Sequence, residues 1–186
     1  MFARFRRARL DAGIPATLYG AIVAQARTSA LYTDLAVPDT VEGRFEMVTA
    51  HTGLVLRRLG RGDETARAVG QGVFDVFCDE MDDALRALGV KDTSVGKRMR
   101  KLAEAYYGRT EAYDAAFAAG DAKLLAATLR RTVYGGGGGV AATAMAAYML
   151  AADRILATTP TDRVIAGKIV WPAIAVPVPL PAEDQT

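Results

Sequence analysis

The sequence predicts an all-α protein, a single domain of six to seven helices followed by a proline-rich extended C-terminal arm. Apolar residues recur at spacings of three and four along most of the chain, which is the period of an amphipathic helix. No stretch shows the alternation or the turn signals of paired strands. The 186 residues are 51% hydrophobic and 24% charged, a composition that suffices for one folded domain and excludes a wholly disordered chain.

Proline, capping residues and glycine bound the first two helices. The first begins near Pro15, a residue suited to the first helical turn, and ends before Pro38. The second opens with Asp39 as its N-cap and has Glu42 three residues later, the spacing of a capping box. Gly60 is placed to end it, after an apolar stripe of helical period.

The next two helices carry opposite charges. The third has its apolar face over 69–88, acidic residues on the other face, and Gly89 as its end. Asp92 or Ser94 is the expected N-cap of a fourth helix, whose basic residues face outward. Gly108 is expected to end that fourth helix.

Glycine and aspartate also divide the segment that follows. A short fifth helix is expected over 110–119, so that Arg109 lies at a corner between two helices. Gly120 ends the fifth helix and Asp121 caps a sixth.

A glycine run, an apolar helix and a proline-rich tail complete the chain. The glycines of 135–139 predict a flexible joint, because each glycine inside a helix costs about 1 kcal/mol relative to alanine. An alanine-rich seventh helix follows over 140–157, and its apolar run is shorter than the ~20 residues of a membrane span, which predicts a soluble chain. The expected divisions are a basic segment 1–14, a helical domain 15–157 and an extended arm 158–186.

Charge and composition exclude several functions. The net charge of +2 is too balanced for a dedicated nucleic-acid binder. With one cysteine, Cys78, and one histidine, His51, the chain forms no internal disulfide and no Cys/His zinc site. We therefore expect no metal and no cofactor. The arginine-rich first ten residues leave three interpretations open: an ordinary helix start, a fragment of a mitochondrial presequence, and a segment that contacts anionic lipid or RNA.

The candidate reactive residues favour structural roles. His51 lies inside the apolar stripe of the second helix, which is typical of a core or groove histidine rather than a catalyst. Cys78 adjoins Asp79 and Glu80, whose charges disfavour a thiolate. The carboxylates of the third helix lack calcium-loop spacing and indicate a solvated or ion-paired face. The basic face of the fourth helix is either solvated or a contact for an acidic partner, lipid headgroups or RNA, and comprises Lys97, Arg98, Arg100 and Lys101.

Four segments in order resemble the ubiquinol-cytochrome c chaperone family, the helical assembly factors of respiratory complex III. They are VPDTVEGRFEMVTAHTGLVLRRL, QGVFDVFCDEMDDALRALGV, YYGRTEAYDAAF and DAKLLAATLRRTVYG, and the resemblance covers about residues 31–152. One departure is Thr132, where the family usually has Asn. The residues carrying the resemblance are Tyr106, Tyr107, Gly108, Arg109, Tyr113 and Asp114, with Arg131, His51, Phe77 and Asp79 also at matching places.

The resemblance implies a non-enzymatic chaperone that holds newly made cytochrome b until haem and partner subunits are added. The short N-terminus is similar to that of the bacterial branch, which implies the cytoplasm or the periphery of the inner membrane; a eukaryotic member implies the mitochondrial inner membrane or matrix. A small partner subunit, the ribosome and an anionic membrane surface stay open as further partners, and sequence-specific nucleic acid is not expected. The alternative is a lipid- or quinone-binding helical module at the same membrane.

The resemblance also suggests roles for individual residues. Arg109 is expected to be structural, bridging helix-end carbonyls to a carboxylate such as Asp114 or one on the third helix. The remaining family residues expected to be structural are His51, Asp79, Gly108 and Arg131. The expected client or partner contacts are Tyr106, Tyr107, Tyr113, Met81 and Phe77.

Overall fold

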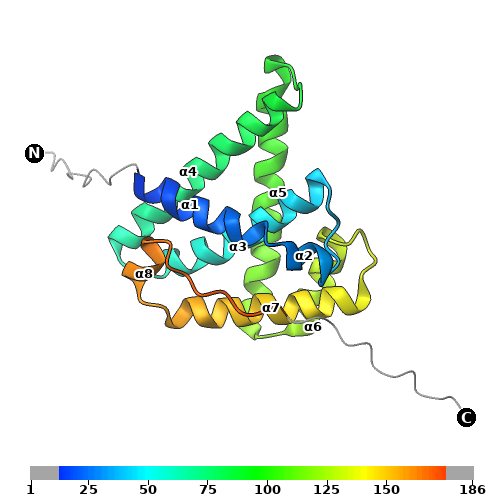
Figure 1. The fold of residues 1–186 in the computed structure, drawn as a ribbon. Coiled ribbons are helices and arrows are strands. Elements are labelled where there is room, and N and C mark those ends of the chain that lie inside the picture. Colours follow the sequence, from blue (N-terminus) through cyan, green and yellow to red (C-terminus); the bar gives the residue numbers. More distant parts are fainter. Residues whose placement is uncertain (1–12, 175–186) are drawn as a thin grey trace, which may run out of the picture.

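The computed structural model describes residues 13–174, and these residues form eight helices and no strand (Figure 1). The predicted all-α class is confirmed, with six long helices and two short ones that the sequence pattern did not separate. The helices are α1 Gly13–Ala26, α2 Ser29–Thr33, α3 Val41–Gly60, α4 Glu64–Ala87, α5 Asp92–Ala119, α6 Ala122–Thr132, α7 Gly139–Thr158 and α8 Thr161–Ile165.

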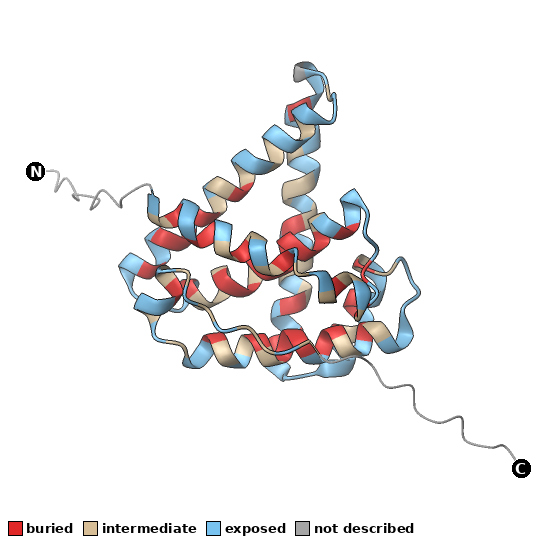
Figure 2. Ribbon diagram, in the orientation of Figure 1, coloured by how far each residue is buried: buried red, intermediate tan, exposed pale blue. Residues whose placement is uncertain are grey.

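Helix α3 lies at the centre of the body and packs against α1, α4, α5 and α7, while α6 packs along α7. Helices α4 and α5 run antiparallel, and the end at which they join projects away from the body (Figure 1). We call residues 78–105 the hairpin arm. Among its described side chains only Val95 is buried, whereas the body contains most of the core (Figure 2).

The start of α3 differs from the prediction by one residue. Thr40, not Asp39, is the N-cap, and its hydroxyl accepts a hydrogen bond from the Gly43 amide at 3.1 Å. Asp39 instead pairs with Arg44 at 2.6 Å on the surface. The expected first helix is also divided, because α1 ends at Ala26 and α2 is a separate turn.

Helix α5 runs unbroken through Gly108, so the predicted helix end there is wrong. The loss of about 1 kcal/mol at one glycine is small beside the packing of α5 against α3, α4 and α6. The expected capping of this helix is also wrong, because it begins after Lys91 without a side-chain cap. The predicted end at Gly120 and the predicted Asp121 cap of α6 are confirmed.

The glycine run forms a turn of defined geometry. Gly135, Gly136 and Gly138 all have positive φ, and the Gly136 amide donates to the Arg130 carbonyl at 2.8 Å. A Cβ on Gly138 would lie 2.5 Å from a ring carbon of Tyr134. Alanine at the positive-φ positions would therefore be strained.

Helix α7 has 20 residues and, by length and composition alone, is long and apolar enough to cross a membrane. Its buried residues pack against α6 and α3 as part of the core. The expected extended arm contains α8, and Ile169, Trp171 and Ile174 beyond it pack against the core. The basic N-terminal segment up to residue 12 and the tail from residue 175 lie outside the described residues.

Candidate functional site

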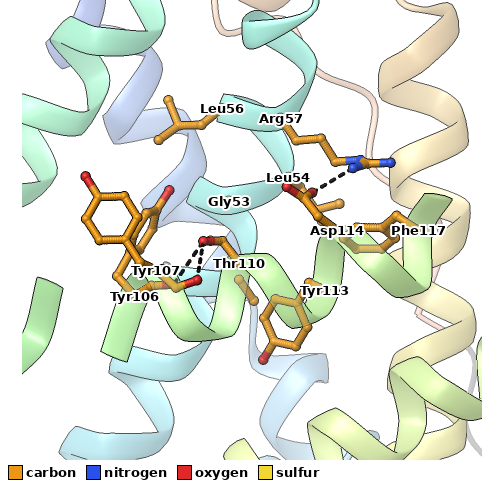
Figure 3. Close-up of a pocket in the computed structure, with 11 residues that line it drawn as sticks. Gly53, Leu54, Leu56, Arg57, Tyr106, Tyr107, Thr110, Tyr113, Asp114 and Phe117 are labelled. Carbon is orange, nitrogen blue, oxygen red and sulfur yellow. Dashed lines mark hydrogen bonds and ion pairs between the residues drawn. The ribbon is translucent and has the colours of Figure 1, made fainter. Parts of the chain in front are cut away.

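A groove of about 250 Å³ lies between α3 and α5 at the base of the hairpin arm (Figure 3). Helix α3 contributes small residues to it, and Gly53 brings the two helices close, since a Cβ there would lie 3.1 Å from the Thr110 methyl group. Helix α5 supplies most of the larger side chains. The lining residues are Ala50, Gly53, Leu54, Leu56, Arg57, Tyr106, Tyr107, Thr110, Tyr113, Asp114 and Phe117.

Aromatic rings form one end of the groove. The ring of Tyr106 is tilted against those of Phe74 and Phe77, with centroid distances of 5.3 Å and 5.4 Å, and it is itself buried. Tyr107 packs edge-on against Tyr106 at 5.6 Å, yet 59% of its surface stays exposed. The cluster therefore holds an exposed aromatic side chain on a rigid buried base, an arrangement suited to protein contacts.

Arg57 forms the other end of the groove and joins three helices. Its side chain donates to Asp114 of α5 at 2.7 Å and to Asp153 of α7 at 3.0 Å. The guanidinium also lies over the Phe117 ring, 5.3 Å from its centroid. Asp114 is thus an ion-pair partner, as its expected structural role implies, but it pairs with Arg57 rather than Arg109.

Arg109 lies in the middle of α5, not at a corner, and its partner is Glu46 of α3. The guanidinium donates through Nε to Oε2 at 2.6 Å and through Nη2 to Oε1, so the pair is bidentate. Burial raises the pKa of the Glu46 carboxyl, although the hydrogen bond from Arg109 acts in the opposite direction. The expected structural role of Arg109 fits this geometry, whereas the expected carboxylate was wrong.

His51 is buried in the body, outside the groove, at the end of a hydrogen-bonded chain. Its Nδ1–H donates to the Met47 carbonyl at 2.7 Å, which leaves Nε2 to accept from the Tyr148 hydroxyl at 2.9 Å. Gln25 donates to the same hydroxyl at 2.9 Å, and Trp171 packs edge-on against the imidazole. Complete burial lowers the pKa of His51 to about 4, so the ring is neutral at pH 7.

The expected client contacts separate by exposure. Tyr107 is exposed and Met81 is half-buried on the hairpin arm. Tyr106, Phe77 and Tyr113 are buried, and of these Tyr106 and Tyr113 line the groove with the small part of their surface that stays accessible. The Tyr113 hydroxyl donates to Thr132 at 3.0 Å, and Thr132 in turn donates to the Thr128 carbonyl.

The other family residues lie at the surface. Asp79, Gly108 and Arg131 are exposed, and within the described part of the chain neither charged side chain has an ion pair or a side-chain hydrogen bond. The structure therefore gives Asp79 and Arg131 no packing role. The basic face of α5 is likewise exposed, at Lys97, Arg98, Arg100 and Lys101.

The described residues give no sign of a reactive centre. Burial and the nearby charges of Asp75 and Asp79 raise the pKa of the Cys78 thiol, which keeps it protonated at pH 7. Residues 13–174 hold no group of three or more His, Cys, Asp or Glu side chains that could bind a metal ion.

Sequence reasoning missed the long-range polar partners. Glu46 and Arg57 lie near the groove, and Tyr148 and Gln25 lie around His51. A signal existed for Glu46, since it lies four residues before Ala50 and seven before Gly53, on the small-residue face of α3. No feature of the sequence near Glu46 identified Arg109 as its partner, because the two residues lie 63 positions apart in the chain.

Comparison with known proteins covers most of the chain. The model of the ubiquinol-cytochrome C chaperone family matches residues 33–171, which include the groove and the hairpin arm. The crystal structure of the Cbp3 homolog from Brucella abortus is similar, with a TM-score of 0.80 and 37% sequence identity over 87% of this chain and 90% of that one. A comparison with curated proteins gives no match.

Proposed function

Because this chain belongs to the ubiquinol-cytochrome c chaperone family, we propose that it binds newly made cytochrome b during assembly of complex III. The family expected from the sequence is confirmed. The protein is a non-enzymatic assembly chaperone for ubiquinol-cytochrome c reductase. The proposal adds the client, the surface that receives it, and a place at the cytoplasmic periphery of the inner membrane.

The groove between α3 and α5 supports the proposal. A chaperone for a membrane protein needs an accessible apolar surface that does not collapse on itself. Tyr107 supplies exposed aromatic area, and the stacked rings beneath it keep its position fixed. A client helix laid along the groove would place apolar side chains against Tyr107 and Leu56 and polar groups near Arg57.

No observation favours the alternative of a lipid- or quinone-binding module. The groove of about 250 Å³ is smaller than the ~300 to 1,000 Å³ typical of sites that enclose a small ligand. Its position between two helix surfaces suits side chains of a partner better than an enclosed molecule. A small partner subunit and the ribosome stay predictions.

Photo-crosslinking at Tyr107 tests the client site. A photoreactive phenylalanine analogue replaces Tyr107 in one protein and Leu124, which is 43% exposed on α6, in a matched control. Cytochrome b is then synthesised in the presence of membranes and each protein. We expect a cytochrome b adduct from position 107 and none from position 124. Equal adducts at both positions, or an adduct only from α6, would place the client elsewhere.

A pair of substitutions tests the energetic importance of the same side chain. Tyr107→Ser should reduce capture of cytochrome b by about tenfold, the effect of removing a central aromatic contact. Leu124→Ser should leave capture unchanged. Both proteins should melt within a few degrees of the parent, because both side chains are exposed. Unchanged capture by Tyr107→Ser would contradict the proposed surface.

A further inference from the structure

The tip of the hairpin arm exposes an aliphatic residue far from the core. Leu88 ends α4 and is 63% exposed, and Gly89 and Val90 complete the turn into α5. The arm projects from the body, so its tip meets a partner before the body does (Figure 1). An exposed leucine at such a tip has no packing function within the described structure.

The tip also concentrates positive charge. Residues 88–101 contain five Lys or Arg and one Asp, a net charge of +4, whereas the whole chain has only +2. The rest of the chain is therefore at −2. Residues 78–87, the α4 side of the arm, carry four Asp or Glu and one Arg, so the arm as a whole is neutral and its positive charge lies on the α5 side. None of these five cations forms an ion pair with another described residue. They are Lys91, Lys97, Arg98, Arg100 and Lys101.

All five cations are exposed, on the surface of α5 or just before its first residue. Val95 is buried and Met99 is half-buried, and Lys97 and Lys101 lie one turn apart on the opposite side of the helix. From Lys91 to Lys101 the helix rises by about 15 Å. The arm thus presents an aliphatic tip and, behind it, a basic strip that a flat anionic surface could contact along its length.

We propose that the hairpin arm docks the protein on an anionic lipid surface, with Leu88 in the interfacial region and the basic strip against the headgroups. Basic residues beside an inserted apolar side chain are the combination that binds peripheral proteins to acidic bilayers. Residues 78–105 contain no aromatic residue and no histidine, so the arm lacks the aromatic rings on which proteins stack the bases of single-stranded RNA.

Docking in this way would fix the distance between the client groove and the bilayer surface. Tyr107 lies 16 residues beyond Lys91 in the same continuous helix, which places it at most about 24 Å along α5 from the tip. The groove would then face segments of a membrane protein close to the bilayer surface. The docking inference itself does not depend on the identity of the client.

Vesicle flotation of the full chain tests the inference. The protein is mixed with vesicles of phosphatidylcholine alone, or of phosphatidylcholine with phosphatidylglycerol. We expect flotation with the acidic vesicles only, declining as salt is raised. Each lysine or arginine near such a surface strengthens binding by about fivefold, so the double variant Lys97→Glu with Lys101→Glu should bind at least about 25-fold more weakly.

Two further variants test whether the loss of flotation is specific to the arm. Lys123→Glu with Lys168→Glu changes the net charge equally on the body, at exposed positions, and should float like the parent. Leu88→Ser should weaken flotation on the order of tenfold without altering the melting temperature. Equal loss in the body variant and the arm variant would mean that only total charge matters, and the inference would fail.

Other outcomes also decide between explanations. Flotation with neutral vesicles, or flotation unaffected by the arm variants, would overturn the inference. Sedimentation with RNA or ribosomes but not with acidic vesicles would assign the arm to nucleic acid instead. Capture of cytochrome b in detergent separates this inference from the proposed client site: the arm variants should retain capture, and Tyr107→Ser should lose it while still floating.

Discussion

The arginines of the body and the cations of the hairpin arm behave as two different classes of residue. In the body, Arg57 bridges α3 to α5 and α7, and Arg109 holds Glu46 across the α3–α5 contact. Arg58 donates to the Leu156 and Thr159 carbonyls and so closes the end of α7. On the arm, the five cations of residues 88–101 are exposed and have no ion-pair partner in the described chain.

This difference separates charge used for folding from charge available for binding. A body arginine has exchanged water for internal acceptors, so its removal leaves a buried group unpaired. An arm cation stays hydrated in the free protein, so its replacement changes the unfolding free energy little. Basic residues of the body and of the arm should therefore give opposite results in stability and binding measurements.

Removal of the Arg109 side chain should have the largest effect. Arg109→Ala leaves the Glu46 carboxylate buried without its bidentate partner, which typically costs roughly 3 to 5 kcal/mol of unfolding free energy. For a chain of this size each kcal/mol lowers the melting temperature by about 2 to 4 °C, so we expect a fall of about 10 °C, measured by circular dichroism. Complex III assembly should be reduced because less of the protein is folded at the growth temperature.

A double variant controls for this interpretation. Glu46→Met with Arg109→Met replaces the pair by apolar side chains of similar length and should recover most of the stability, because neither charge remains buried. An Arg109→Ala protein that melts like the parent yet fails to bind cytochrome b would refute the structural role. Arg109 would then belong with the binding surface.

Acid should destabilise the body through His51. Below pH 6.5 the unfolded chain takes up a proton that the folded imidazole, with its pKa lowered to about 4, does not yet accept. Stability therefore falls as pH falls, by about 2 kcal/mol between pH 7 and pH 5. Urea unfolding at the two pH values measures the change.

His51→Gln isolates this contribution, because glutamine does not titrate. The variant should be less stable than the parent at pH 7 and should lose less stability on acidification. Glu46 acts in the opposite direction, since its raised pKa makes the folded chain bind the extra proton at acidic pH. A parent protein that loses no more stability between pH 7 and pH 5 than His51→Gln does would show that the His51 chain opens readily.

The glycine turn provides a smaller test within the body. Gly138→Ala introduces a Cβ at positive φ and against the Tyr134 ring, and should cost about 1 to 2 kcal/mol. Gly139→Ala, at the first residue of α7, has open space and should stabilise by up to about 1 kcal/mol. Thermal melting shows whether each variant is more or less stable than the parent. Stabilisation by both substitutions would instead support the flexible joint predicted from the sequence.

The outcome at Gly108 shows how far the sequence predicts this fold. Helical periodicity and the Gly120 and Asp121 signals sufficed for the class and for several boundaries, because these signals are local. The predicted helix end at Gly108 was wrong because tertiary packing on both sides of this residue decides whether the helix continues. The spacing of apolar residues does not predict a projecting arm either. The apolar stripe of α4 has the same period whether the partner helix lies in the body or in the arm.

The candidate site was predicted in part for the same reason. Tyr107 was found through the family resemblance, but its exposure and the burial of Tyr106 next to it depend on the orientation of α5. The partnership of Arg109 with Glu46 joins residues that only the packing of α3 on α5 brings together. Residue type and spacing identified the important segments, whereas long-range geometry assigned the roles within them.

Reversal of the arm charges should have the smallest effect on stability. Lys97 and Lys101 are exposed, face away from α4 and have no ion-pair partner among the described residues. Surface substitutions of this kind usually change the unfolding free energy by less than about 0.5 kcal/mol, so Lys97→Glu with Lys101→Glu should melt within about 2 °C of the parent. The same melting series includes Arg109→Ala, which removes a single charge and should lower the melting temperature much further. If the arm variant fell as far as the body variant, the distinction between folding charge and binding charge would be wrong.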